Sequence, residues 1–185
     1  DREVTYRTLD ARATRCANAL SALGVRKGDR VFVLLPNRME TLEVLFGCLK
    51  IGAVYTPANF RFAAEEVAFL VDDVGASALV FDSEYADKAG EVLAERPKLP
   101  AVEIGGHTVK SAKAYESCLA AAAESEPFCS TAPDDTSMIL FTAGTTGRPK
   151  GVKLTHRSTF FACLSNGISA AMTTHDIYLG APPLL

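Results

Sequence analysis

Val31-Phe32-Val33-Leu34-Leu35 is an unbroken apolar run that follows the turn Lys27-Gly28-Asp29 and ends at Pro36-Asn37, and the fold class depends on it. A strand with one face in water alternates apolar and polar residues, whereas a continuous apolar run suits a strand that is covered on both faces. The run therefore predicts a buried strand of a parallel sheet.

Helical patterns and further strands flank this run. Before it, residues 8–23 place apolar side chains at steps of four and three, with Thr8 as the expected N-cap. After it, a buried helix over 39–51 and a second helix over 64–74 alternate with short strands at 54–56, ended by Pro57, and at 78–81. Such alternation allows right-handed crossovers between parallel strands. The sequence therefore predicts an α/β fold, a mostly parallel sheet flanked by helices.

Between residues 83 and 137 the pattern is weaker. A helix over 85–95, a strand over 101–104 and a helix over 115–124 are expected. Residues 125–136, with two prolines and the acidic pair Asp134-Asp135, are typical of a loop. We therefore expect a first α/β subdomain over 1–130 and the start of a second subdomain over 131–185.

Composition narrows the function classes. The chain has 185 residues, a hydrophobic fraction of 48% and a formal charge of −3, without the basic excess of a typical nucleic-acid binder. Its apolar stretches are shorter than the ~20 residues of a membrane-spanning helix, and its first residues lack the features of a targeting peptide. Five cysteines without a Cys-x-x-Cys pair predict buried, reduced thiols and no metal site. We expect a cytoplasmic protein, and the apolar ending Pro182-Pro183-Leu184-Leu185 suggests a piece of a longer chain.

Residues 142–151 carry the chemistry. This segment, Thr142-Ala143-Gly144-Thr145-Thr146-Gly147-Arg148-Pro149-Lys150-Gly151, follows the strand-like residues 138–141 and holds three glycines, three threonines and two cations without an acid. Glycines let backbone N–H groups approach anionic oxygens, and threonine hydroxyls and cations add donors and charge. The composition fits a loop that binds a triphosphate; an ordinary solvent-exposed hairpin loop is the alternative.

The spacing excludes two common phosphate loops. A Walker A loop is Gly-x-x-x-x-Gly-Lys-Ser/Thr and opens a helix, whereas here Lys150 follows a proline and leads into the strand-like residues 152–154. The dinucleotide pattern Gly-x-Gly-x-x-Gly does not occur. A strand, a loop and a second strand are predicted instead, followed by a helix that begins near Thr155.

Residues 141–151 resemble the signature of the adenylate-forming, AMP-binding superfamily, which reads approximately Tyr/Phe-Thr-Ser-Gly-Thr-Thr-Gly-x-Pro-Lys-Gly. Only Ala143 departs from it. Three further blocks resemble the family in its order: residues 154–156, residues 49–61, and residues 5–10 with 28–31. The resemblance implies that the chain belongs to the large N-terminal domain of such an enzyme. Gly144-Thr145-Thr146-Gly147 and the Asn59-x-Arg61 ending look more like acyl-CoA synthetases than peptide-synthetase adenylation domains.

The resemblance also implies a reaction and a site. A carboxylic acid, expected to be a fatty acid, attacks ATP bound with Mg²⁺ to give acyl-AMP and pyrophosphate, and coenzyme A then takes the acyl group. Arg148 is expected to be a solvated cation, and His156 a packing or hydrogen-bonding residue; no catalytic residue and no metal ligand are expected within this segment, which alone should be inactive. The residues expected to contact the ATP phosphates are Thr142, Ala143 through its backbone, Gly144, Thr145, Thr146, Gly147 and Lys150.

Two other hypotheses fit the same residues. The chain could be a non-catalytic α/β scaffold or partner-binding module that keeps the fold. It could also come from another adenylate-forming enzyme, an aryl-CoA ligase or a peptide-synthetase adenylation domain. The sequence leaves open which acid is used, which thiol accepts the acyl group, and the oligomeric state.

Overall fold

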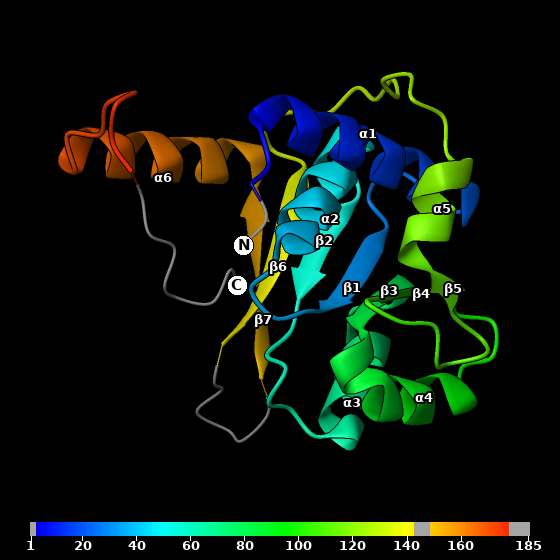
Figure 1. Ribbon diagram of the computed structural model, residues 1–185. Coiled ribbons are helices and arrows are strands. Elements are labelled where there is room, and N and C mark those ends of the chain that lie inside the picture. Colours follow the sequence, from blue (N-terminus) through cyan, green and yellow to red (C-terminus); the bar gives the residue numbers. More distant parts are fainter. Residues whose placement is uncertain (1–2, 143–148, 178–185) are drawn as a thin grey trace.

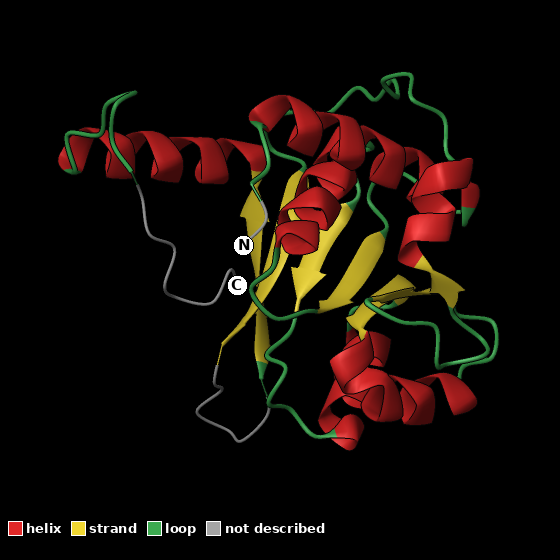
Figure 2. Cartoon of the chain, viewed as in Figure 1, coloured by secondary structure: helices red, strands yellow, loops and turns green. Residues whose placement is uncertain are grey.

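The computed structural model describes residues 3–142 and 149–177, and in them one seven-stranded sheet lies between helices (Figures 1 and 2). The strand order is β5-β4-β3-β1-β2-β6-β7, and every neighbouring pair is parallel except β6 and β7. The predicted α/β fold with a mostly parallel sheet is therefore confirmed. The strands are β1 (Arg30–Leu34), β2 (Val54–Pro57), β3 (Ala76–Asp82), β4 (Ala101–Ile104), β5 (Lys113–Ala114), β6 (Thr136–Thr142) and β7 (Lys150–Thr155).

Helices cover the two faces of the sheet unequally. One face carries the first, second and fifth helices and the other carries the third and fourth, while the sixth extends away from the sheet beyond β7 (Figures 1 and 2). The helices are α1 (Tyr6–Ala22), α2 (Met39–Lys50), α3 (Ala64–Asp73), α4 (Ala86–Ala94), α5 (Tyr115–Ala121) and α6 (His156–Ser169), with a 3-10 turn at Ser83–Tyr85.

Strand β1 contributes side chains to the hydrophobic cores on both faces of the sheet, which explains its unbroken apolar sequence. Val31 and Val33 join the core under α1, α2 and α5, while Phe32 and Leu34 join the core under α3 and α4. All four side chains are buried. Each contributes about 1.5–3 kcal/mol relative to an exposed position, so the strand holds the two layers together.

Two helix ends differ from the prediction. Helix α1 begins three residues earlier than expected, because Thr5 rather than Thr8 is its N-cap: the Thr8 backbone N–H donates to the Thr5 hydroxyl over 3.1 Å. Helix α5 ends at Ala121 rather than near residue 124, because the Asn18 amide donates to the carbonyls of Ala123 and Ser125. Strand β5 was not predicted, since two residues are too short to show a periodic pattern.

The connection from α5 to β6 is fastened to the first two helices. Lys50 donates to both oxygens of Glu126, and the Thr14 hydroxyl donates to the same carboxylate. Further along, Lys27 donates to the carbonyl of Ser130 over 2.7 Å. The predicted loop over 125–136 is therefore held by these hydrogen bonds. The strand after it, β6, joins the same sheet beside β2. The division into subdomains at residue 130 stays a prediction.

The prediction of buried cysteines is only partly right. Cys16 and Cys48 are buried, Cys118 and Cys129 are half-buried, and Cys163 is exposed, all as free thiols. Cys163 lies on α6, whose apolar side chains Phe160, Phe161 and Ile168 are also exposed. The helical pattern around Cys163 correctly predicted a helix. Such a pattern does not show whether another element packs against the helix and buries the cysteine.

Candidate functional site

The described ends of β6 and β7 frame the predicted phosphate loop. The two strands pair antiparallel, with Thr142 opposite Lys150, and the Thr142 hydroxyl donates to the Lys150 carbonyl over 3.4 Å. Both residues are exposed. The predicted order of strand, loop, strand and helix is confirmed on both sides of the loop, and α6 follows with Thr155 as its N-cap.

Of the predicted phosphate contacts, the structure therefore brings Thr142 and Lys150 together. The five others, Ala143, Gly144, Thr145, Thr146 and Gly147, lie outside the described residues, as does Arg148.

The sheet places this hairpin end at its carboxyl edge. Strand β6 runs parallel to β2, which runs parallel to β1, so Thr142 lies at the same edge as the carboxyl-terminal residues Pro57 and Leu34 (Figure 1). In open α/β sheets, ligands bind outside the carboxyl ends of the strands. The position of Thr142 and Lys150 is therefore one that the fold favours for a ligand.

The connection after β2 is ordered by local contacts. The Asn59 side chain accepts a hydrogen bond from the Arg61 backbone N–H over 3.0 Å, which fixes the turn. Phe60 stacks on Tyr85 with 5.8 Å between ring centroids, and the Arg61 guanidinium lies 5.8 Å from the Phe60 ring.

An ion pair fills the point where the strand order reverses, between β1 and β3. Arg38 follows β1 and donates to Glu40 over 2.7 Å and to Asp82, the last residue of β3. Burial lowers the pKa of the Arg38 guanidinium, but the hydrogen bonds to Glu40 and Asp82 raise it above its ordinary value. The ion pair therefore lies at the point where nucleotide-binding sheets bind their ligands. Sequence reasoning missed this pair, because Arg38 and Asp82 are 44 residues apart.

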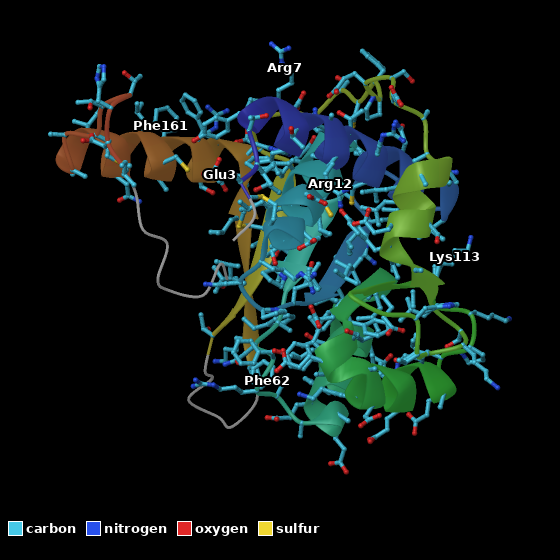
Figure 3. All side chains as sticks on the ribbon, viewed as in Figure 1. Glu3, Arg7, Arg12, Phe62, Lys113 and Phe161 are labelled. Carbon is cyan, nitrogen blue, oxygen red and sulfur yellow. The ribbon has the colours of Figure 1, made fainter. Side chains whose placement is uncertain are left out.

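A second cluster of titratable groups is buried between α1, α2 and α5. Glu43 is fully buried and accepts hydrogen bonds from Arg12 and from the Tyr115 hydroxyl. Burial raises the pKa of the neighbouring Cys16 thiol to about 12, so this thiol is not a nucleophile at neutral pH. Figure 3 shows Arg12 among the side chains between the helices, whereas Arg7 on the same helix points away from the molecule. The cluster joins helices and lies on the face opposite α3 and α4.

A hollow lies at the other edge of the sheet. It has a volume of about 510 Å³ and is lined by residues at the amino ends of the strands, including Arg30, Val54 and Thr136. Two of its cations contact other groups of the chain: Lys27 lies 2.8 Å from Asp135, and Arg30 donates to the Val74 carbonyl over 2.7 Å. Along β7 the lining of this hollow also includes Gly151, the residue after Lys150.

The described part of the chain shows neither a metal site nor a membrane-spanning helix. None of its groups of three or more His, Cys, Asp or Glu side chains is placed to hold a metal ion. None of its helices is long and apolar enough to cross a membrane.

Known proteins resemble the chain along its whole length. The family model described as AMP-binding enzyme matches residues 1–185. The long-chain-fatty-acid–CoA ligase FadD13 of Mycobacterium tuberculosis is 38% identical over 167 residues, which are 89% of this chain and 32% of that protein. The feruloyl-CoA synthase of an Amycolatopsis species is 36% identical over 98% of this chain and 34% of its own length.

A solved structure shows the same arrangement. The inhibitor-bound N-terminal domain of FACL13 from Mycobacterium tuberculosis matches with a TM-score of 0.74 and 37% identity, over 84% of this chain and 38% of that one. The chain spans about a third of the length of the curated relatives named above. The resemblance seen in residues 141–151 is confirmed: the chain belongs to the AMP-binding enzyme family.

Proposed function

We propose that this chain is the N-terminal part of an ATP-dependent acyl-CoA synthetase. In the first step a carboxylate oxygen of the substrate attacks the α-phosphorus of ATP, the bond to the β-phosphate breaks, and pyrophosphate leaves. In the second step the thiol of coenzyme A attacks the acyl carbon, and AMP leaves. The observation that carries the proposal is the pairing of Thr142 with Lys150 at the carboxyl edge of the sheet, in a chain that matches the family throughout.

The role of this part of the chain is electrostatic. Negative charge develops on pyrophosphate as it leaves, and preorganised donors and a cation at that position lower the barrier. Strand pairing fixes the backbone at Thr142 and Lys150, so their side chains start from set positions. The proposed ATP contacts are Thr142, the backbone of Ala143, Gly144, Thr145, Thr146, Gly147 and Lys150.

A fatty acid is the proposed substrate, as the name of the FadD13 relative suggests. The feruloyl-CoA synthase relative supports an aromatic acid as the second candidate, because its identity to this chain is almost as high. We infer that Mg²⁺ enters bound to the phosphates of ATP. We assign it no ligand among residues 3–142 and 149–177, where no metal-binding group is found. The cytoplasmic location stays a prediction.

The test uses the full-length protein with ATP, labelled pyrophosphate and a panel of fatty and aromatic acids. Carboxylate-dependent exchange of pyrophosphate into ATP supports the proposal, and the acid with the highest kcat/KM identifies the substrate class. Absence of exchange with every acid would reject the enzymatic function and leave the non-catalytic scaffold as the better hypothesis.

A further inference from the structure

A row of side chains crosses the sheet next to the hairpin end. Phe141 on β6 and Phe32 on β1 lie with 6.1 Å between their ring centroids, although β2 runs between the two strands. Strands two places apart are separated by about 9.6 Å, so the rings lean toward each other over β2. Thr56, the residue of β2 paired with Phe32, is fully buried and small enough to leave them room.

Gly151 lies on the other side of the Phe141 ring. It is the residue of β7 opposite Phe141 in the antiparallel register. A Cβ atom at Gly151 would lie 3.6 Å from Cε1 of Phe141 and 3.0 Å from Cγ2 of Ile139. An aromatic ring beside a glycine of an edge strand is a device that fixes strand register. Phe141 is therefore held between Gly151 and Phe32.

The contacts of Phe141 with Phe32 and Gly151 add to a short backbone pairing between β2 and β6. The register between β2 and β6 contains the pair Tyr55 and Met138, and Phe141 lies three residues further along β6. Three residues of a strand span about 10 Å, so the end of β6 extends well past that pair. At this end, the contact of Phe141 with the core under α3 and α4 ties the hairpin to the sheet.

We propose that Phe141, held between Phe32 and Gly151, is a positioning residue that sets where Thr142 and Lys150 present their side chains. It acts through these two neighbours and touches no substrate. Thr142 follows Phe141 directly, and Lys150 precedes Gly151 and pairs with Thr142. The effect of Phe141 on ATP binding rests on the proposed function. The anchoring of the β6–β7 hairpin by Phe141 does not depend on that function.

The experiment uses four variants of the full-length protein. Phe141→Leu removes the ring, and Phe141→Tyr keeps it. Gly151→Ala places a methyl group 3.0 Å from Cγ2 of Ile139 and in van der Waals contact with the Phe141 ring, so β7 must shift at this point. Phe81→Leu is the matched control, because Phe81 is fully buried in the same core cluster but lies on β3. Amide hydrogen exchange is measured on peptides covering 136–142 and 150–155, and the KM for ATP and for the acid are measured by pyrophosphate exchange.

We expect Phe141→Leu and Gly151→Ala to speed amide exchange in both peptides about tenfold, with little change in Phe81→Leu and Phe141→Tyr. The same two variants should raise the KM for ATP about tenfold and leave the KM for the acid unchanged. A loss of stability alone would lower the amount of active protein without moving the KM for ATP.

The outcomes separate the two proposals. Amide exchange in Phe141→Leu that equals that of Phe81→Leu would overturn the anchoring role, whatever the activity. Faster exchange with an unchanged KM for ATP would overturn the link to the phosphate site. Faster amide exchange in a protein without pyrophosphate exchange would support the anchor while rejecting the synthetase function.

Discussion

Arg12 on α1 donates a 2.6 Å hydrogen bond from Nε to Oε1 of Glu43 on α2, and this glutamate is fully buried. The other Glu43 oxygen accepts from the Tyr115 hydroxyl of α5 over 2.9 Å, and Arg12 also pairs with Glu116 of α5. Three helices that cover one face of the sheet therefore meet at one carboxylate.

Removing Arg12 should destabilise the fold strongly. Arg12→Ala leaves Glu43 buried without its cation, and breaking a buried pair costs about 3–5 kcal/mol. The measurement is the free energy of unfolding in urea. Arg7→Ala on the same helix is the control, since Arg7 is exposed and should change stability by less than about 0.5 kcal/mol. Equal losses in the two variants would contradict the importance given to the pair.

Glu103 should make stability depend on pH. This buried carboxylate at the end of β4 accepts hydrogen bonds from the Thr108 backbone and hydroxyl and from the Val109 backbone, each at 2.9 Å. Burial raises the pKa of Glu103, but the hydrogen bonds from Val109 and Thr108 outweigh it, so the pKa lies below its ordinary value. Its contribution is therefore complete above the unfolded pKa and is lost as pH falls through the folded pKa.

Glu103→Gln should cost about 1–3 kcal/mol at pH 7, because one acceptor oxygen is replaced by a donor. The difference from the unmodified protein should shrink below about pH 4.3, the pKa of an unfolded glutamate. Unfolding curves between pH 3 and pH 7 measure it, with the exposed Glu91→Gln on α4 as the control. A difference that stays constant with pH would refute the electrostatic explanation.

Lys150→Ala should slow adenylation in the full-length protein. A transition-state donor of this kind contributes about 2–4 kcal/mol, which corresponds to a loss of about 30- to 1000-fold in rate. Single-turnover formation of acyl-AMP measures the step directly. Lys153→Ala is the matched control, because Lys153 is exposed on the same strand and lines the hollow at the opposite edge. An unaltered rate in Lys150→Ala would remove Lys150 from the site.

Gly52 should tolerate a side chain less well than Gly24, although both have positive φ. A Cβ at Gly52 would lie 2.8 Å from Sγ of Cys129, whereas a Cβ at Gly24 has no neighbour within 4 Å. Gly24→Ala should cost about 1–2 kcal/mol for the left-handed backbone. Gly52→Ala should cost about 1–3 kcal/mol more because of the overlap. Thermal unfolding of both variants compares them, and equal shifts would count against the overlap.

The fold could be predicted from the sequence where a pattern is local. The run 31–35 is buried on both sides, so its composition alone identified the strand that separates the two cores. The strands on either side of the predicted phosphate loop followed from residues within the same segment. Their function needed the resemblance to a family, because exposed loops without function are also rich in glycine and threonine.

What could not be predicted depends on contacts between distant residues. Arg12 meets Glu43 across 31 positions and Glu116 across 104, and no periodic pattern connects them. The same holds for Phe32 and Phe141, whose rings meet only because β2 places β1 and β6 on either side of it. Charges and rings of this kind look like ordinary surface or core residues until the strand order is known.

The antiparallel return from β6 to β7 determines what kind of charge can act at the loop. A helix that begins at a phosphate contributes about half a positive charge from its macrodipole. Here α6 begins at His156, at the far end of β7, about 20 Å of strand away from Lys150. The helix dipole therefore contributes little at the hairpin end. Among the described residues at this end, the positive charge comes from the Lys150 side chain and not from a helix N-terminus.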